Sequence, residues 1–531
     1  MRRVYVRHIL TVSVAVAIGL IALVLFQRIG IISKFPDNGE QPSLASKVTD
    51  NGEQPSLASK VADNGEQPSL ASKVTDNGEQ PSLASKVTDN GERLRIVKDR
   101  FKLTWDAYRT NAMGKDEINP LTGWAKDHVW GGWGVTLIDS LDTLWLMGMK
   151  DEFKEASQAI ARVDFTRGDV TTSFFEVTIR NLGGLISAYD LSGEKHLLEK
   201  ARELADVLLK AFDSPSGYPY MLFNFHSQTP VKQSSSSLAD VGSCQLEFAR
   251  LSQLTGDDKY RKTAFEVYHK LNEAKYEDGM YYTGVDVSTG TFSSSTFSFG
   301  ASGDSFFEYL IKLNVLLPNN DTDAKLFLKM FSDSIENLKK LLVNPCHGNH
   351  LCLGMIRYGR FEASTEHLNF FVPGMLLLAE KYLPNSNLAK LGLELLDTFA
   401  TIPSLTSTGL APETIAFSAT APMQVTNPYN FLRPELIESL FYAYYYTRDN
   451  NYRDHAWALF SAFDQYSKAS YGYAEYRDVT NPSKGANQVG NMPSYFMAET
   501  FKYFLLIFQD NPLSLDEWVF NTEAHPFKVT K

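Results

Sequence analysis

Basic charge is scarce in this chain of 531 residues, and that scarcity excludes one large class of partners. There are 51 lysines and arginines against 62 aspartates and glutamates, which gives a net charge of −11 and a pI near 5.5. Nucleic-acid binding needs a basic face for the phosphates, so we expect no nucleic-acid partner. The composition is otherwise globular, because 44% hydrophobic residues suffice for a large core.

Cysteine is also rare, with only Cys244, Cys346 and Cys352 in the chain. Cys346 and Cys352 flank a short segment and could close a small disulfide hairpin, which would suit an oxidising compartment. His347 and His350 lie between them, so a Cys/His zinc site is the alternative. The spacing matches no standard zinc pattern, which disfavours that alternative without removing it.

Long uncharged hydrophobic runs are absent except near the N-terminus. Residues 9–26 form such a run of 18 residues, preceded by Arg2, Arg3 and Arg7 and followed by Arg28. That length just spans a bilayer as a helix. The arginines favour a cytoplasmic tail of residues 1–8 and a lumenal remainder. A cleaved signal peptide is the alternative, but no small-residue cleavage site follows, so we predict a single-pass type II transmembrane signal anchor.

Aromatic residues and metal-ligating clusters are missing from the repeats that fill most of the next segment, residues 27–93. The phrase Asp-Asn-Gly-Glu recurs there every 13 residues, at Asp37, Asp50, Asp63, Asp76 and Asp89. One leucine and one valine per complete copy cannot form a packed face, and glycine and proline punctuate the repeats. We therefore predict a flexible, disordered stalk rather than an array of binding modules.

Helical patterns dominate the remainder, residues 94–531, and short turn phrases interrupt them at regular intervals. An apolar stretch precedes each phrase, and an amphipathic stretch such as residues 195–212 follows most of them. A period that holds two helices fits a helical hairpin. Seven hairpins could stack as an open solenoid. They could also close into a toroid, which we favour because the apolar helices carry carboxylates that need a shared, partly wet centre. The phrases begin at Gly148, Ser192, Thr255, Asn319, Pro384, Thr447 and Asp510, the last six 63 to 65 residues apart.

Acidic residues stand out against the apolar helices. Each of them alone could be a satisfied buried ion pair. Several on successive inward helices would raise one another's pKa, which gives the separated acid and base that glycoside hydrolysis needs. Aromatic residues crowd the same segments and suit sugar rings. The residues by themselves thus predict an all-α, carbohydrate-active toroid. The acidic set is Glu176 (with Arg180 one turn later), Asp304 and Glu308, Glu413, Glu435, Glu438 and Glu499.

Six phrases, in order, resemble the class I α-1,2-mannosidases, which form glycoside hydrolase family 47. The resemblance covers nearly all of residues 94–527. The phrases are Gly131–Gly134 with Asp139–Leu144, Phe175–Arg180, Gln245–Phe248, Gly303–Leu310, Arg433–Leu440 and Val519–Pro526.

This resemblance implies an (α/α)7 barrel of helical hairpins, in agreement with the number of turn phrases. It also implies calcium-dependent hydrolysis of terminal α-1,2-linked mannose from high-mannose N-glycans on glycoproteins. The anomeric carbon is inverted, which requires two carboxyls about 6.5–9.5 Å apart with a water between base and sugar. The expected location is the membrane of the endoplasmic reticulum or Golgi, with a lumenal catalytic domain. A mannosidase-like lectin that targets glycoproteins for degradation, with little turnover, is the alternative.

Site residues follow from the same resemblance. Glu176 would be the general acid, directly or through a water, and Glu435 the base, with Asp304 a third essential carboxylate. The Thr522 hydroxyl and carbonyl would hold a calcium ion together with waters, an oxygen set that suits this hard cation. Glutamates around the ion would accept hydrogen bonds from its waters. The expected substrate-binding residues are Arg180, Glu247, Ser302, His367, Arg433, Glu438, Glu499 and Tyr495.

The sequence departs from the family pattern at three places. Phe370 and Phe399 stand where the family has a disulfide, so we expect an aromatic contact between them. Met492-Pro493-Ser494 replaces Met-Glu-Ser, with Tyr495 where phenylalanine is common. Ser302 occupies a position that helps to select which mannose is removed. In addition, Asn320-Asp321-Thr322 is a glycosylation sequon that could be used in a lumenal domain. Oligomeric state does not follow from the sequence.

Overall fold

The computed structural model describes residues 87–167, 171–276 and 279–530. The predicted anchor and almost all of the predicted stalk lie outside these residues. Within the described part of the chain, no helix has the length and apolar character needed to cross a membrane.

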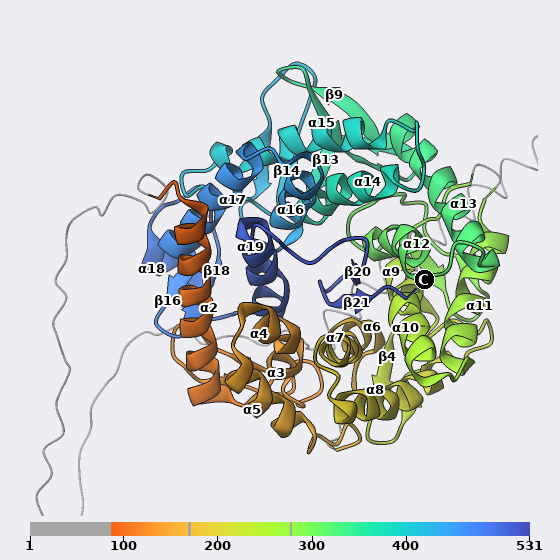
Figure 1. Ribbon diagram of the computed structural model, residues 1–531. Helices are drawn as coiled ribbons and strands as arrows, with labels where there is room; N and C mark the ends of the chain where they lie inside the picture. The colour runs from red at the N-terminus through yellow and green to blue at the C-terminus, as the bar shows by residue number, and fades with distance from the viewer. Residues whose placement is uncertain (1–86, 168–170, 277–278, 531) are drawn as a thin grey trace, which may run out of the picture. The chain divides into compact units, whose positions relative to one another are not determined.

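The helices form pairs arranged as a ring (Figure 1). Seven inner helices contact one another in chain order, and the last contacts the first, so the ring is closed within the described residues. The inner helices are α4 (Leu141–Met147), α7 (Gly183–Ser192), α10 (Gln245–Thr255), α12 (Asp304–Leu316), α14 (Val372–Glu380), α16 (Glu435–Thr447) and α19 (Phe501–Phe508). Their outer partners are α5 (Lys150–Ile160), α8 (Lys195–Leu208), α11 (Lys259–Ala274), α13 (Thr322–Asn337), α15 (Leu388–Thr401), α17 (Asn451–Ala462) and α2 (Asn90–Ala112).

The predicted hairpins are confirmed, with one difference at the seventh. Six turn phrases join an inner helix to the outer helix that follows it. The phrase at Asp510 follows α19, but no outer helix comes after it within the described residues, which end at 530. The outer partner of α19 is instead α2, from the beginning of the domain, so the two ends of the domain close the ring.

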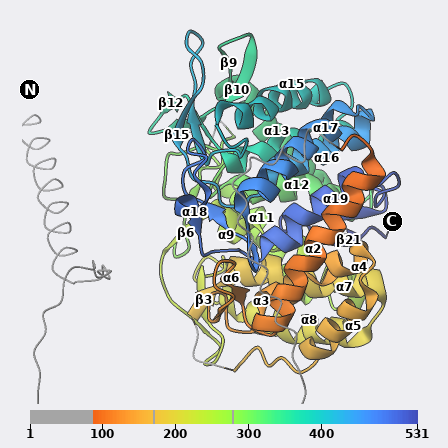
Figure 2. The same cartoon turned by 90° about the vertical axis from the view of Figure 1, so that its left-hand side faces the viewer.

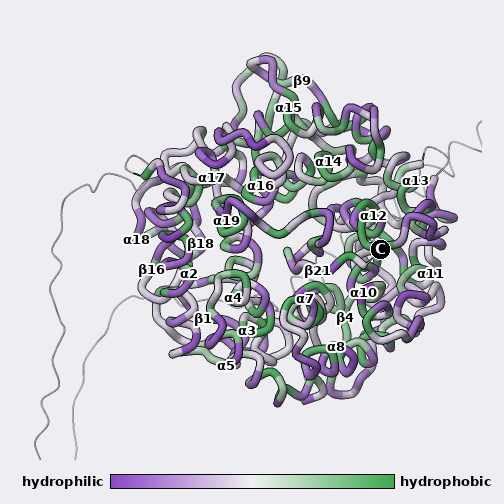
Figure 3. The backbone as a smooth tube through the Cα atoms, in the orientation of Figure 1, coloured by the Kyte–Doolittle hydropathy of each residue, from purple (hydrophilic) through white to green (hydrophobic). Residues whose placement is uncertain are grey.

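Hydrophobicity explains the two layers. Every residue of α19 is buried, whereas the outer helix α8 buries mainly one stripe, such as Ala201, Leu204 and Leu208. A helix that is apolar all round needs neighbours on every side, while an amphipathic one can cover a surface. In Figure 3 the hydrophobic colour accordingly runs along the inner helices and the hydrophilic colour along much of the outer rim.

Short antiparallel strands, which the all-α prediction missed, also occur, and most of those labelled in Figure 2 lie on one side of the ring, with β21 on the other. Three of these strands lead directly into segments with candidate site residues: β3 into α6 (Phe174–Glu176), β6 into α9 (Leu238–Gly242) and β13 into the 3₁₀ turn His367–Phe371. The three-stranded sheets are β3 (Thr171–Ser173), β4 (Leu222–Asn224) and β5 (Thr229–Pro230); β6 (Ser235–Ser237), β7 (Gly284–Asp286) and β8 (Thr291–Phe292); and β13 (Ser364–Glu366), β14 (Thr414–Ala416) and β15 (Gln424–Asn427). The hairpin of β20 (Trp518–Phe520) and β21 (Pro526–Lys528) lies in the middle of the ring in Figure 1.

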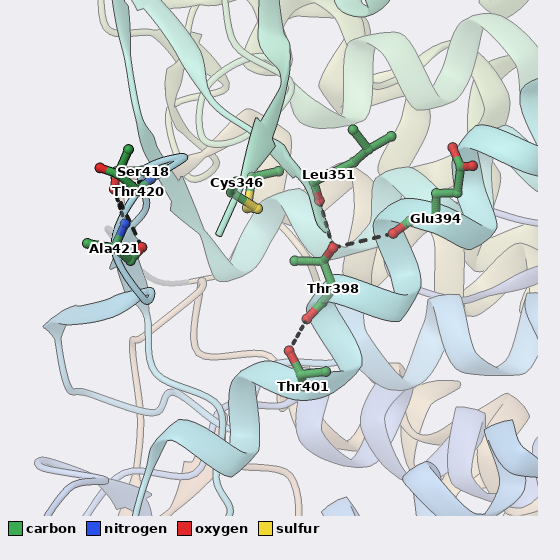
Figure 4. The surroundings of a disulfide bond; sticks show 9 residues. Cys346, Leu351, Glu394, Thr398, Thr401, Ser418, Thr420 and Ala421 are labelled. Atoms are coloured by element: carbon green, nitrogen blue, oxygen red, sulfur yellow. Dashed lines mark hydrogen bonds between the residues drawn. A yellow bond between two sulfur atoms is a disulfide. The ribbon is translucent and has the colours of Figure 1, made fainter. Parts of the chain in front are cut away.

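Cys346 and Cys352 form a disulfide between β9 (Val343–Cys346) and β10 (His350–Leu353). The disulfide interpretation is therefore confirmed, and the zinc alternative is wrong because both sulfurs are used. Figure 4 shows the neighbouring hydrogen bond that ties this hairpin to α15, in which Thr398 Oγ1 donates to the Leu351 carbonyl at 2.7 Å. Cys244 is free and buried.

The expected aromatic contact is also present. The rings of Phe370 and Phe399 are fully buried, with centroids 4.6 Å apart. Phe370 comes from the 3₁₀ turn that precedes α14, and Phe399 comes from α15. The pair therefore joins an inner helix to its outer partner where the family resemblance implies a disulfide.

The domain begins before residue 94, where it was predicted to start. The fifth copy of the repeat forms the first turn of α2, with Asp89 as N-cap accepting from the Glu92 amide at 2.8 Å. Arg93 is buried and donates to the Val87 carbonyl. The predicted stalk and the folded domain therefore overlap over residues 87–93.

A chain that starts at Leu94 is expected to be less stable than one that starts at Val87. It would lack the cap and first turn of α2 and would remove buried Val87 and Arg93, a loss of about 1–3 kcal/mol. Thermal unfolding of both truncated chains measures the difference, and equal melting temperatures would contradict it. Because neither Asp89 nor Arg93 lines the pocket described below, both chains should have the same kcat.

Candidate active site

A pocket of about 620 Å³ opens inside the ring of inner helices. Its lining comes from chain segments far apart in sequence, which meet because the inner helices surround a common centre. The lining is polar except for Phe175, Ile179, Met221, Ala239, Ala301, Leu368 and Pro434. The polar members are Glu176, Arg180, Gln233, Ser235, Ser236, Ser237, Asp240, Ser302, Asp304, Ser305, Arg433, Glu435, Tyr495, Glu499, Thr522 and Glu523.

Glu176 and Arg180 lie on one wall, at a break in helical geometry. Ser173 ends β3 and caps the short helix α6 (Phe174–Glu176), accepting from the Glu176 amide at 3.2 Å. A π-helical stretch, residues Val177–Leu182, follows. Such wide turns are frequent at functional sites. Arg180 Nε donates to Glu176 Oε2 at 2.7 Å, so the predicted pairing across one turn is confirmed.

Asp304 begins α12 after a tight loop. Ser302 has a left-handed backbone with φ of 71°, and its carbonyl accepts from the Ala239 amide at 3.0 Å. This conformation turns the chain so that both Ser302 and Asp304 line the pocket. Burial, with help from Glu366 and Glu308, raises the pKa of Asp304 to about 7. Asp304 is thus suited to hold a proton near neutral pH.

Glu435 stands at the start of α16, as predicted from Pro434. Burial raises its pKa to about 8, although Arg433 acts in the opposite direction. Arg433 is fixed by a bidentate pair with Glu413, both contacts being 2.9 Å. His367 Nε2 lies 3.8 Å from Glu435 Oε2, and burial lowers the pKa of His367 to about 3, so this ring is neutral.

The floor of the pocket is the turn between β20 and β21. Asn521 shapes the turn, since its Oδ1 accepts from the amides of Glu523 at 2.9 Å and His525 at 2.8 Å. Thr522 and Glu523 thereby face the pocket together with Glu499, from the π-helical stretch Phe496–Thr500. Burial raises the pKa of both glutamates well above the ordinary range, helped by Glu523 and Glu435 at Glu499 and by Asp139 and Glu176 at Glu523.

Nine of the twelve predicted site residues line this pocket, and three lie behind it. His367 packs against Glu435. Glu438 accepts from the Tyr503 hydroxyl at 3.2 Å. Glu247 accepts from Tyr309 at 2.6 Å, and the Tyr309 hydroxyl in turn accepts from the Thr522 amide at 3.3 Å. The nine are Glu176, Arg180, Ser302, Asp304, Arg433, Glu435, Tyr495, Glu499 and Thr522.

Sequence analysis missed one whole wall of the pocket. Gln233, the three serines of β6 and Met221 come from strands and loops, which carry no helical periodicity to single them out. Asp240 also belongs to this wall and receives hydrogen bonds from Ser237 in a capping box. Four consecutive serines before an inner helix were the only available signal.

The pocket fits a hard divalent cation. Oxygen is the donor that calcium prefers, and Thr522 presents oxygens at the floor. Burial first, and then nearby carboxylates, raise the pKa of Glu435, Glu438, Glu499 and Glu523, and a divalent charge would stabilise their ionised forms. No cluster of three or more histidine, cysteine, aspartate or glutamate residues in the described ranges is arranged to bind a metal directly. Direct ligation by Thr522, with carboxylates farther out, agrees with that finding.

Two carboxylates in one pocket are what glycoside hydrolysis requires, and the match to a glycoside hydrolase family gives the class of this protein. The family model described as glycosyl hydrolase family 47 matches residues 100–529, and the chain belongs to that family. The α-1,2-mannosidase from Trichoderma reesei is 31% identical, with a TM-score of 0.79 over 84% of this chain and 100% of that one.

Curated relatives carry consistent names. The mannosyl-oligosaccharide 1,2-alpha-mannosidase of Arabidopsis thaliana is 40% identical over 82% of this chain and 79% of its own length. The endoplasmic reticulum mannosyl-oligosaccharide 1,2-alpha-mannosidase of Homo sapiens is 37% identical over 82% of this chain and 64% of its own length. The human mannosyl-oligosaccharide 1,2-alpha-mannosidase IB is 35% identical, with 82% of this chain and 69% of that protein covered.

Proposed function

We propose that this protein removes terminal α-1,2-linked mannose from high-mannose N-glycans of glycoproteins, with inversion of the anomeric carbon. The observation that carries the proposal is the presence of Glu176, Asp304 and Glu435 in one pocket of a family 47 hydrolase. The names of the related mannosidases supply the substrate class.

Glu435 is the proposed base. Its Oε2 atom is buried and has no hydrogen-bond partner among the described residues, so it can accept a proton from a nucleophilic water. A base must be ionised, whereas burial raises its pKa to about 8. Arg433 favours the ionised form, and a nearby divalent cation would favour it further.

Proton delivery to the leaving oxygen is assigned to Glu176, acting through a water. Arg180 Nε donates to Glu176 Oε2 at 2.7 Å, which fixes the position of the Glu176 carboxyl. Burial raises the pKa of Asp304, which lines the same pocket, to about 7, so this carboxyl can hold a proton near neutral pH. We therefore propose that Asp304 and Glu176 share this task, and that inversion follows from the separation of acid and base.

Calcium is the proposed cofactor. Thr522 would hold it, with Glu438, Glu499 and Glu523 around it, and a bound calcium ion would orient sugar hydroxyls and offset the buried negative charge. Tyr495 supplies an aromatic wall, and its hydroxyl donates to the Phe431 carbonyl at 2.6 Å. Glu247 and His367 support the floor and the base from behind.

The proposed setting is the lumen of the endoplasmic reticulum or Golgi. Residues 9–26 would anchor the protein in the membrane, and the repeats would hold the domain away from it. The disulfide between Cys346 and Cys352 suits an oxidising lumen.

Release of free mannose from α-1,2-mannobiose tests the proposed function directly. The experiment uses the domain from Val87 onward and the same domain with Glu435→Gln. Mannose release by the first protein alone supports the proposal. Glycan binding without release would favour the lectin alternative instead.

Ser302→Arg is expected to narrow the set of products. Serine is short and uncharged at the pocket wall, whereas arginine carries a forked set of donors that can select one glycan branch. The unchanged protein should therefore remove more than one α-1,2-mannose in sequence. Chromatography of the product isomers over time checks this.

The control is Ser234→Ala, which changes an exposed serine next to β6 that does not line the pocket. This change should leave the products unaltered. Accumulation of a single product by the unchanged protein, at long times and high enzyme, would show that Ser302 does not open the site to several branches.

A further inference from the structure

Three charged side chains are fully buried beneath the pocket: His525, Asp139 and Asp142. His525 Nδ1 lies 2.7 Å from Asp142 Oδ2, and His525 Nε2 lies 3.0 Å from Asp139 Oδ1. An ionised carboxylate only accepts, so both ring nitrogens must carry a hydrogen and the ring is an imidazolium. Burial opposes this charge, but the two aspartates outweigh it and raise the pKa of His525.

Two glycines of helix α7 leave room for the His525 ring. A Cβ atom on Gly183 would come within 2.9 Å of His525 Cδ2, and one on Gly184 within 3.3 Å of His525 Cε1. Both glycines directly follow the π-helical stretch that carries Arg180. The ring therefore lies against the segment that shapes the catalytic wall.

The two aspartates face different neighbours. Asp142 contacts Lys502 at 2.9 Å and accepts from the Ser187 hydroxyl at 2.8 Å, both away from the pocket. Asp139 instead lies 3.7 Å from Arg180 Nη1. The imidazolium is therefore connected to the catalytic wall through Asp139 and not through Asp142.

Ser494 contacts both Asp139 and Arg180. Its hydroxyl donates to Asp139 Oδ2, and its oxygen lies 3.5 Å from Arg180 Nη1. The same Nη1 of Arg180 also donates to Glu523, while its Nε donates to Glu176 Oε2 at 2.7 Å, so Asp139 and Glu523 hold the guanidinium together. The contacts form an unbroken path from His525 through Asp139 and Arg180 to Glu176.

We propose that Asp139, oriented by the His525 imidazolium, is a positioning residue that sets Arg180 and thereby the Glu176 carboxyl in the productive geometry. The proposal rests on the proposed function, in which Glu176 takes part in proton delivery. Arginine has a long side chain with several rotatable bonds, so its guanidinium needs fixed acceptors to be held in one place. Asp139 is fixed on both sides, because one oxygen is bound by His525 and the other by Ser494.

Asp139→Asn and His525→Gln are the test variants, assayed for mannose release as a function of substrate concentration. Each should lower kcat by about tenfold or more while KM changes little, because Glu176 acts on the transition state rather than on sugar binding. Ser494→Ala, a smaller change on the same path, should lower kcat in the same sense by less. The Ser494→Ala variant still tests the inference if Asp139→Asn and His525→Gln fail to fold.

Asp190→Asn is the matched control. Asp190 is also a buried carboxylate of α7, paired with Arg250 at 2.7 Å and accepting from the Lys528 amide, yet it has no contact with Arg180. This variant should lose thermal stability as Asp139→Asn does and keep wild-type kcat. Equal kcat values in wild-type, Asp139→Asn and His525→Gln enzymes would overturn the inference, leaving only a structural role. A wild-type protein that releases no mannose would instead contradict the proposed function, and the inference with it.

Discussion

Glu435→Gln and Glu176→Gln are each expected to lower kcat by about a hundredfold or more, the scale on which general acid–base catalysis operates. Glutamine has nearly the shape of glutamate but cannot accept the proton of the nucleophilic water or carry one to the leaving oxygen. Both side chains line the pocket, and Glu435 Oε2 is otherwise without a hydrogen-bond partner among the described residues. Initial rates of mannose release from α-1,2-mannobiose measure the loss.

Glu475→Gln provides the matched control for these two variants. Glu475 is more deeply buried than either, accepts from Tyr429 at 2.8 Å and Asn491 at 2.7 Å, and does not line the pocket. Its kcat should stay near that of the wild type. If Glu435→Gln or Glu176→Gln also turned over at the wild-type rate, that residue would lose its proposed role.

The fold was predictable to the extent that it depends on periodicity. Apolar stretches before the turn phrases and amphipathic stretches after them correspond to the inner and outer helices, because burial on all sides and burial on one side leave different patterns. The seventh pair was not predictable this way. Its outer helix is α2, more than 380 residues away from the inner helix α19, and no local pattern encodes that contact.

The candidate site residues were likewise predictable only in part. Residues on helices, such as Glu176 with Arg180 and Glu435 after Pro434, were found because an acidic side chain in an apolar helix is conspicuous. The family resemblance added Thr522, which no pattern marks. Depth could not be predicted: Glu247, Glu438 and His367 lie behind the pocket, since a one-dimensional spacing does not tell a lining residue from one that supports it.

Removal of calcium is expected to abolish activity and to lower thermal stability. A ligand that binds only the native state stabilises it by about 2.7 kcal/mol when present at 100 times its dissociation constant, and chelation removes that contribution. The buried carboxylates Glu438, Glu499 and Glu523 give the physical reason, because burial and neighbouring carboxylates raise their pKa and a bound cation would offset that negative charge. Thermal unfolding with excess chelator, followed by re-addition of calcium, measures the effect independently of turnover.

Thr522→Val separates the proposed ligand from the general charge of the site. Valine keeps the shape of threonine but removes the hydroxyl that faces the pocket, so this variant should require much higher calcium to recover its melting temperature. Thr178→Val is the control, because the Thr178 hydroxyl is buried and donates to the Phe174 carbonyl at 2.7 Å, away from the floor. Its response to calcium should match that of the wild type. An unchanged melting temperature and full activity in excess chelator would exclude calcium as the cofactor. A Thr522→Val enzyme with wild-type calcium dependence would show that the Thr522 hydroxyl is not a ligand of the ion.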